Sequence, residues 1–171
     1  IAINAKVQRP GVCNAMETLL VDEAIAEEVL PLLKDAFDDA HTQLKGCELT
    51  QKSIDVALAT EADYDTEYLA NILNIKVVDG VNCAIEHIVR FGSGHSEAII
   101  TENITTAEAF LNGVDAAAVY VNASTRFTDG GAFGFGAEVG ISTNKLHARG
   151  PMGIEGLTTY KFKIYGSGQI R

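Results

Sequence analysis

The sequence has no excess of basic residues, no long apolar run and no even set of cysteines. Its 171 residues contain 13 Lys and Arg against 23 Asp and Glu, a formal net charge of -10, which argues against nucleic-acid and anionic-membrane partners. The longest apolar run, residues 116–121, is far shorter than the roughly 20 residues that span a bilayer. Cys13, Cys47 and Cys83 are widely spaced, which fits reduced thiols and a cytoplasmic location better than a disulfide framework.

Several nucleotide-binding and hydrolase motifs are also missing. The glycines never form GxGxxG between a predicted strand and a helix, and neither a Walker loop nor a GxSxG nucleophile elbow occurs. The chain begins without Met and without the basic-then-apolar pattern of a secretory signal, so we expect a trimmed start and no leader. With 47% apolar and 21% charged residues, the composition is that of a folded globular domain.

Strand-like and helix-like segments alternate along residues 18–121. Apolar or β-branched runs predict strands at residues 18–21, 72–78, 96–101 and 116–121. Apolar residues spaced three or four apart predict helices at residues 23–44, closed by Gly46, at 81–92 and at 103–113. The residues before Gly11 are expected to be extended. This alternation predicts an α/β fold with a mainly parallel sheet and helices on both faces.

The C-terminal part has a different pattern. Residues 122–156 are rich in glycine and lack apolar periodicity, which predicts a long ordered loop of the kind that carries function or an interface. Residues 157–165 alternate Thr, Tyr, Phe and Ile with Lys, as a half-exposed strand does. Because a lone strand is not stable, this one needs a partner sheet in a missing part of the polypeptide or in another subunit.

Cys13 is the first candidate for chemistry. It follows an Arg-Pro-Gly turn at residues 9–11, and it is expected to open a helical turn that continues through Asn14. The free N–H groups and the positive dipole end of a helix N-terminus favour the thiolate, which is the nucleophilic form of cysteine. The alternative is that Cys13 is a small buried apolar residue.

Two further groups of residues are of types that bind metals or transfer protons. Cys83 and His87 are four residues apart on a predicted helix, with His95 nearby, but no fourth ligand has a recognisable spacing. A helix-packed thiol with a hydrogen-bonded histidine explains the pair as well, so no metal site is predicted. The acidic run EADYDTE, residues 61–67, is either a carboxylate pair for acid–base chemistry or a solvated loop, and its composition favours the loop.

Four segments resemble one family. The segment NAKVQRPGVCNAMETLLV, residues 4–21, resembles the nucleophile region of the γ-glutamyl phosphate reductases, which are members of the aldehyde dehydrogenase superfamily. The same family is matched, in the same order, by DYDTEYL at residues 63–69, AIEHIVRFGSGHSEAI at 84–99 and VYVNASTRFTDGGAFGFGAEVGISTNKLHARGPMG at 119–153. The departures from the family pattern are Phe91, Gly131 and Ala132.

The resemblance implies a catalytic domain at residues 1–140, a C-terminal loop and oligomerisation strand at residues 141–171, and an N-terminal cofactor-binding domain that is absent from this chain. It implies a reductase of proline biosynthesis, in which Cys13 attacks L-glutamyl 5-phosphate and phosphate leaves. NADPH, bound mainly by the absent domain, then reduces the thioester to L-glutamate 5-semialdehyde. We expect the isolated fragment to be inactive, and glutamate 5-kinase is a candidate partner.

The family's motifs also assign roles to residues of this sequence. Glu67 matches the superfamily carboxylate that accepts hydrogen bonds from the ribose beside the nicotinamide. The strand end where superfamily substrates bind is matched by Asn122, Ser124, Thr125 and Arg126. Arg126 has the planar fork that holds a phosphate or a carboxylate. For these four residues the alternative is a hydrogen-bond network that closes the loop.

Two other functions stay open. The strand at residues 157–165 resembles the one that joins the superfamily's dimer-forming sheet, which implies a homo-oligomer. The chain is therefore either part of the reductase or a non-catalytic assembly module that recruits a partner by strand addition. The third possibility is an aldehyde-oxidising relative with another substrate.

Overall fold

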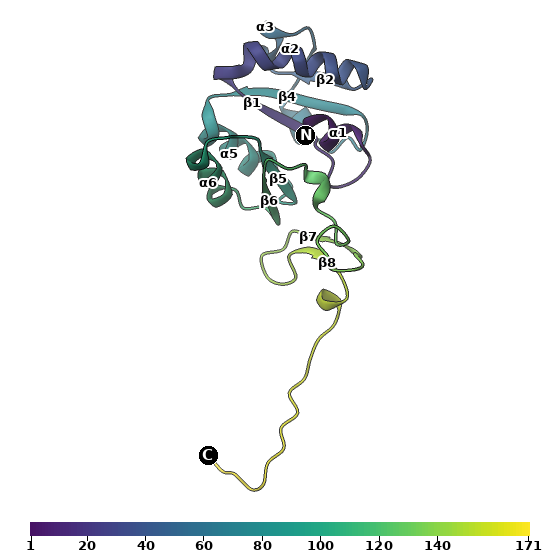
Figure 1. Ribbon diagram of the computed structural model, residues 1–171, viewed down its shortest axis with the longest axis vertical. Helices are drawn as coiled ribbons and strands as arrows, with labels where there is room; N and C mark the ends of the chain where they lie inside the picture. Colours follow the sequence, from purple (N-terminus) through teal and green to yellow (C-terminus); the bar gives the residue numbers. More distant parts are fainter.

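The computed structural model describes all 171 residues as an α/β body followed by an extended tail (Figure 1). The α-helices are α1 (Ala2–Val7), α2 (Glu23–Asp39), α3 (Glu48–Ser53), α4 (Glu61–Tyr64), α5 (Gly80–Phe91) and α6 (Ile104–Gly113). The strands are β1 (Thr18–Asp22), β2 (Gln43–Gly46), β3 (Ala57–Leu58), β4 (Ile72–Val78), β5 (Ser96–Ile99), β6 (Ala118–Val121), β7 (Gly140–Ser142) and β8 (Gly150–Met152). Short 3-10 turns lie at Thr125–Phe127 (η1) and Glu155–Leu157 (η2).

The main sheet has four parallel strands in the order β1-β4-β2-β3. Strand β4 lies between β1 and β2, with Thr18 opposite Asn74 and Gln43 opposite Ile72. A second parallel pair joins β5 to β6, and β7 pairs with β8 in antiparallel fashion. Helices α2 and α3 cover one face of the main sheet, while α5 lies on the other side (Figure 1). The predicted α/β class with a mainly parallel sheet is confirmed.

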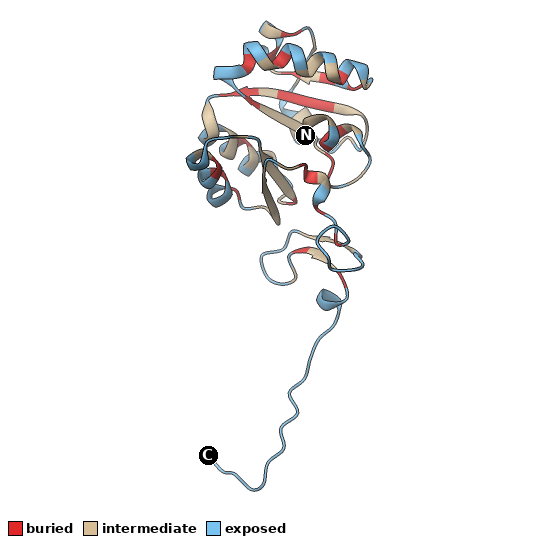
Figure 2. Ribbon diagram, in the orientation of Figure 1, coloured by how far each residue is buried: buried red, intermediate tan, exposed pale blue.

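The hydrophobic core lies between the main sheet and α2. Leu73 and Ile75 of β4 are completely buried, as are Leu30 and Phe37 of α2. Figure 2 shows the buried residues concentrated along β4 and the inward stripe of α2. Strand β4 is apolar except at Asn74 and Lys76, because both of its faces are covered, as in other parallel sheets. Its predicted bounds, residues 72–78, match the structure.

The helix predicted at residues 23–44 ends earlier than expected. Helix α2 stops at Asp39, and residues 43–46 form strand β2 instead of a last helical turn closed by Gly46. His41 takes a positive φ of 54°, which breaks the helix. Leu44 is buried in the sheet opposite Leu73. Its spacing from Phe37 matched a helical stripe by coincidence, so the prediction for this segment was wrong.

The N-terminal segment is helical rather than extended. Helix α1 spans Ala2–Val7 and buries Ala5 and Lys6. The helix has six residues, which is too few for a helical spacing of apolar residues to be recognised in the sequence. The helices predicted at residues 81–92 and 103–113 are confirmed as α5 and α6, and the Asn103 side chain caps α6 by accepting a hydrogen bond from the Thr106 N–H (3.1 Å).

The C-terminal residues 158–171 have no regular secondary structure and extend away from the body (Figure 1). The strand predicted at residues 157–165 does not form, because no second strand is present to pair with it. Tyr160, Phe162, Ile164 and Tyr165 are 80–91% exposed. Upstream, the predicted glycine-rich loop contains η1 and the small β7-β8 hairpin. None of the helices combines the length and apolar character needed to cross a membrane.

An ion pair joins α1 to the residue that precedes β1. The ammonium group of Lys6, a residue with no exposed surface, donates to the Glu17 carboxylate at 2.8 Å. The other carboxylate oxygen of Glu17 accepts the Leu69 N–H at 3.2 Å. A buried charge is costly unless it is paired, so each group of this pair depends on the other.

Replacing Lys6 by Met should therefore destabilise the protein. Lys6→Met keeps the volume of the side chain but leaves Glu17 without its counter-ion, and we expect the free energy of unfolding to fall by about 3 kcal/mol. The double variant Lys6→Met/Glu17→Gln should recover most of the loss, because no charge is then left unpaired. Urea unfolding followed by circular dichroism measures both; equal stability of Lys6→Met and the parent would contradict a structural role for the pair.

Candidate functional site

Cys13 lies in the turn between α1 and β1, and its side chain is exposed. The turn is closed by the Ala15 N–H, which donates to the Val12 carbonyl at 3.0 Å, and it is tied back to α1 by the Met16 N–H and the Ala5 carbonyl (2.9 Å). No helix begins at Cys13, so the predicted helical turn is wrong and no helix dipole acts on the thiol. The alternative of a buried apolar cysteine is also wrong.

Asn14, the residue after Cys13, anchors this turn to a segment more than 100 residues away. It is buried, and its amide donates to the Thr128 carbonyl at 2.9 Å. The Thr125 hydroxyl donates to the Asn14 carbonyl at 2.7 Å, and the Arg126 guanidinium donates to the Asn14 side-chain oxygen. Cys13 is thus exposed but attached to a fixed neighbour. Sequence reasoning did not select Asn14, whose only signal was its position beside the candidate nucleophile.

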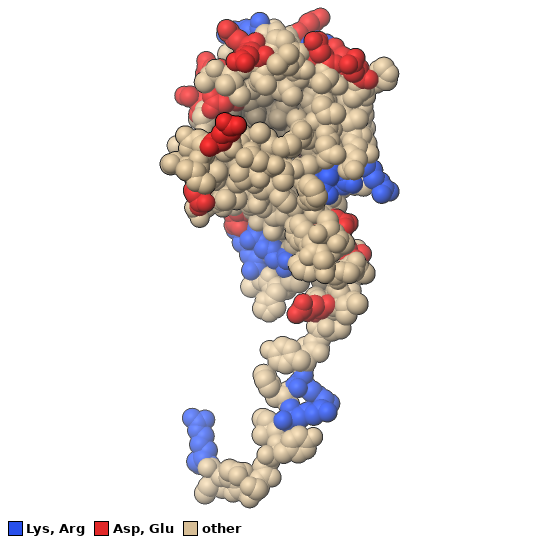
Figure 3. Space-filling view, in the orientation of Figure 1, with Lys and Arg blue, Asp and Glu red and all other residues tan.

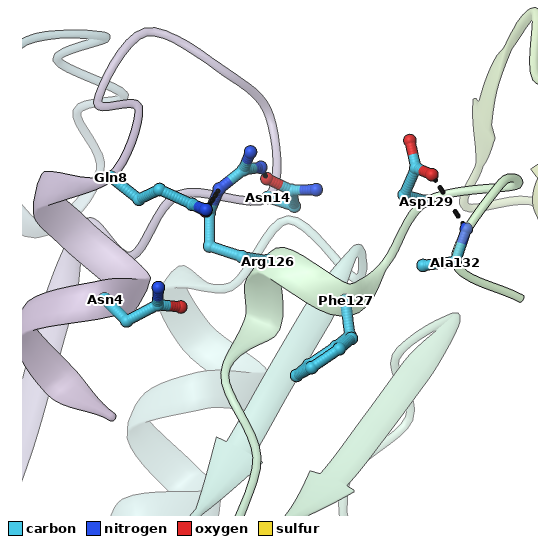
Figure 4. Close-up of a pocket in the computed structure, with 7 residues that line it drawn as sticks. All are labelled: Asn4, Gln8, Asn14, Arg126, Phe127, Asp129 and Ala132. Carbon is cyan, nitrogen blue, oxygen red and sulfur yellow. Dashed lines mark hydrogen bonds between the residues drawn. The ribbon is translucent and has the colours of Figure 1, made fainter.

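A cavity of about 310 Å³ opens beside Arg126 (Figure 4). Its walls are Asn4, Gln8, Asn14, Arg126, Phe127, Asp129 and Ala132. Arg126 donates through Nε to the Gln8 side-chain oxygen at 3.0 Å, and on the other side of the cavity Asp129 accepts the Ala132 N–H at 2.9 Å. The cavity therefore lies between α1, the turn that carries Cys13 and the segment that follows β6.

The other three predicted substrate residues do not line this cavity. Asn122, with a positive φ of 55°, exchanges two hydrogen bonds with the Thr101 backbone and so closes the carboxyl ends of β5 and β6. The buried Ser124 side chain accepts the Arg126 N–H at 3.3 Å, and Thr125 is also buried. The contacts of these three residues are those of the loop-closing network, while Arg126 belongs both to that network and to the cavity.

Glu67 lies on the segment that packs against the turn that carries Cys13. Its side chain is exposed and makes no hydrogen bond within the chain. Gly11 approaches the Leu69 carbonyl so closely that an added Cβ would lie 3.4 Å from it. Glu67 is also near Glu17, whose pKa is raised: burial raises it most, the hydrogen bond and charge of Lys6 and the Leu69 N–H lower it, and the negative charge of Glu67 raises it further. Glu67 is therefore near the Cys13 turn but outside the Arg126 cavity.

The remaining candidates form separate local structures. Asp63, in the acidic run, accepts from Lys45, Thr60 and Tyr68, and the Lys45 contact holds the pKa of Asp63 well below its usual range. This carboxylate is a structural acceptor. Among the histidines, His87 faces Lys76 at 3.2 Å and His95 faces the Ser96 hydroxyl at 2.7 Å.

The metal candidate gains no support. Burial, together with the charges of Lys76 and Arg90, lowers the pKa of His87 to about 4. Cys83, on the same helix as His87, is exposed. No three His, Cys, Asp or Glu side chains gather closely enough to hold a metal ion.

A second cavity of similar volume lies away from Cys13, between the end of α5 and the start of β6. Its most unusual wall residue is Glu97 of β5, which makes no hydrogen bond within the chain. An added Cβ at Gly92 would lie 3.1 Å from a Glu97 carboxylate oxygen, so the glycine at the end of α5 leaves room for this group. Burial raises the pKa of Glu97 to about 7.

Comparison with known proteins finds relatives that share one name. No family model matches the chain. The chain is 88% identical, over all 171 residues, to the γ-glutamyl phosphate reductase of Sulfurovum sp. (strain NBC37-1) and 80% identical to that of Sulfurimonas denitrificans. In both comparisons the chain spans 42% of the length of the relative.

Solved structures give the fold class first. An acetylating aldehyde dehydrogenase from Geobacillus thermoglucosidasius superposes with a TM-score of 0.68 at 20% identity, over 98% of this chain and 48% of that one, which supports the fold alone. The fold is thus that of an aldehyde-dehydrogenase-like α/β domain. More particularly, the γ-glutamyl phosphate reductase of Thermotoga maritima superposes with a TM-score of 0.96 at 56% identity, over the whole chain and 42% of that structure. The predicted resemblance to the γ-glutamyl phosphate reductases is confirmed.

The half-buried Glu97 gives a pH prediction. The folded protein keeps the proton up to about pH 7, whereas the unfolded chain releases it near pH 4.5, so stability from this group is full below pH 4.5 and is lost as the pH rises through 7. Between pH 5 and pH 8 the free energy of unfolding of the parent should therefore fall by about 2 kcal/mol more than that of Glu97→Gln, whose side chain stays neutral. Urea unfolding at both pH values measures this difference; identical pH profiles for the two proteins would contradict the raised pKa.

Proposed function

We propose that this chain is the catalytic portion of an NADPH-dependent reductase that converts L-glutamyl 5-phosphate to L-glutamate 5-semialdehyde in proline biosynthesis. The observation that carries the proposal is the 88% identity to a γ-glutamyl phosphate reductase along the whole chain. The exposed Cys13, held in a fixed turn, supports it. We further propose that residues 1–140 form the catalytic domain and residues 141–171 the assembly segment. We also propose that glutamate 5-kinase is a partner of the enzyme and that the enzyme is cytoplasmic.

In the proposed reaction Cys13 is the nucleophile. Its thiolate sulfur forms a bond to the acyl carbon of the substrate, and the carbon–oxygen bond to phosphate breaks, so that phosphate leaves with the bonding electron pair. Phosphate is a good leaving group, and this step needs no general acid from the chain. The turn around Cys13 contributes position, since Asn14 fixes the adjoining backbone through Thr125 and Thr128.

The residues present fit a nicotinamide nucleotide held partly by this chain. Glu67 presents an exposed carboxylate with no hydrogen-bond partner in the chain, which suits a group that accepts hydrogen bonds from ribose hydroxyls. NADPH, when bound, would supply the reducing equivalents that release the thioester as the semialdehyde. We propose that the other half of the enzyme provides most of the cofactor contacts, so that the fragment alone is inactive.

The test is the reverse reaction of the intact enzyme. Cys13→Ser should lower kcat for phosphate-dependent oxidation of the semialdehyde by at least about 1,000-fold, because a hydroxyl is a far weaker nucleophile than a thiolate at neutral pH. Reduction of NADP, followed at 340 nm, measures the rate. Cys83→Ser, at the other exposed cysteine, is the matched control and should retain activity. Near-normal turnover of Cys13→Ser would refute the assignment, and turnover independent of phosphate would favour an aldehyde-oxidising relative.

A role in assembly is supported by the tail. Tyr160 and Phe162 are at least 80% exposed and stand on the same side of an alternating sequence in which Lys161 and Lys163 take the other positions. Figure 3 shows the tail carrying basic side chains apart from the acidic body. Such a segment buries its apolar side only by adding to a sheet edge. We propose that it adds to a second copy, which makes the enzyme a homo-oligomer.

Removal of the tail should change the oligomeric state. We expect a protein ending at Gly156 to be smaller in assembly than the parent, because it lacks the strand that pairs between subunits. Light scattering of the intact enzyme and of the truncated protein at equal concentration measures the mass. An unchanged mass would contradict the assembly role and would remove the support for the alternative of a non-catalytic assembly module.

A further inference from the structure

The cavity beside Arg126 carries charges of opposite sign on different walls. Arg126 uses Nε and one terminal nitrogen on Gln8 and Asn14, and its other terminal nitrogen has no partner within the chain. Asp129 uses one oxygen on the Ala132 N–H, and its second oxygen makes no hydrogen bond. Arg126 and Asp129 form no ion pair with each other. Figure 4 shows the two groups apart, with Asn4 also on the cavity wall.

The free polar atoms match one kind of ligand. A guanidinium nitrogen donates to a carboxylate or a phosphate, whereas a free carboxylate oxygen accepts from an ammonium group. Asp129 would repel a phosphate, so the pair does not suit a simple anion. It suits a zwitterion in which a carboxylate and an ammonium group leave one carbon atom, as they do in an α-amino acid. The Asn4 side chain makes no hydrogen bond within the chain and adds an amide that can bind either group.

The cavity also lies beside the turn that carries Cys13. Asn14 lines the cavity and directly follows Cys13, and consecutive Cα atoms are about 3.8 Å apart. Three carbon–carbon bonds separate the α-carbon of a glutamyl group from its side-chain acyl carbon, a span of about 4 Å when extended. Cys13 itself does not line the cavity, so the inference requires the glutamyl side chain to extend from the cavity past Asn14 to the neighbouring thiol.

We infer that the cavity bordered by Arg126 and Asp129 binds the α-carboxylate and α-ammonium groups of the glutamyl substrate, with Arg126 holding the carboxylate and Asp129 the ammonium group. This inference rests on the proposed reductase function and adds the part of the site that selects an amino acid. Phosphate, the leaving group, is then bound elsewhere. Arg126 also has a structural role: its contacts with Gln8 and Asn14 help to fix the turn that carries Cys13.

The decisive variant is Asp129→Asn in the intact enzyme. It removes the charge and keeps the shape and an oxygen for the Ala132 N–H, so the loop is preserved. Two substrates are compared in the reverse reaction: L-glutamate 5-semialdehyde, and 5-oxopentanoate, which has the same chain length and carboxylate but no amino group. We expect the variant to lower the ratio of kcat/KM for the first over the second by about 10–100-fold, the usual effect of losing a charged hydrogen bond. Asp55→Asn, a change at an exposed carboxylate outside the cavity, is the matched control and should leave the ratio unchanged.

The outcomes separate the two proposals. If the parent enzyme oxidises the semialdehyde and Asp129→Asn loses the preference for the amino group, the subsite is supported. If the parent is active and the variant keeps the parent's preference, or loses activity equally with both substrates, the subsite is overturned while the reductase function stands. If the parent shows no phosphate-dependent oxidation of either aldehyde, the reductase function is overturned and the subsite with it.

Discussion

The buried pair of Lys6 and Glu17 is the interaction on which the proposed site depends. Lys6 is near the end of α1 and Glu17 immediately precedes β1, so the pair fixes both ends of the ten-residue connection that contains Cys13. Glu17 also binds the Leu69 backbone, which attaches the segment with Glu67 to the same point. A pair of this kind adds little net stability over an apolar pair, but it tolerates the loss of neither partner. It therefore favours one arrangement of the turn over others.

The contacts of Asn14 explain how Cys13 can be exposed and still be held in one position. An exposed turn is normally mobile, and a mobile nucleophile loses the advantage of correct orientation. Here the residue beside the thiol is buried and makes hydrogen bonds to Thr125, Arg126 and Thr128. The exposed atom is thus attached to a rigid backbone. The same contacts bring Arg126 to the cavity, so one hydrogen-bond network supports both the proposed nucleophile and the proposed head-group subsite.

How much the sequence could predict depended on how local the signal was. Strand β4 was predicted with its correct bounds because both of its faces are covered and all of its residues except Asn74 and Lys76 are apolar. Strand β2 was missed because Leu44 continued the helical spacing of α2, and only its pairing with β4 shows its nature. Cys13 and Arg126 were selected by residue type and family motif. Asn14 and Asp129 were missed because their roles arise from contacts with, or a position opposite, distant residues.

The net charge of the chain and the charges inside the cavity act over different distances, and only the charges inside the cavity bear on the proposed chemistry. The net charge of -10 sets a repulsive field for any anion, including a substrate with phosphate and carboxylate groups. That field is screened within about 8 Å at physiological ionic strength. A carboxylate bound to the free nitrogen of Arg126 would be closer to it than this screening distance. The attraction of Arg126 would therefore outweigh the repulsion by the net charge. Asp129 then makes selection possible, since it penalises an anion without an ammonium group while leaving a zwitterion fully paired.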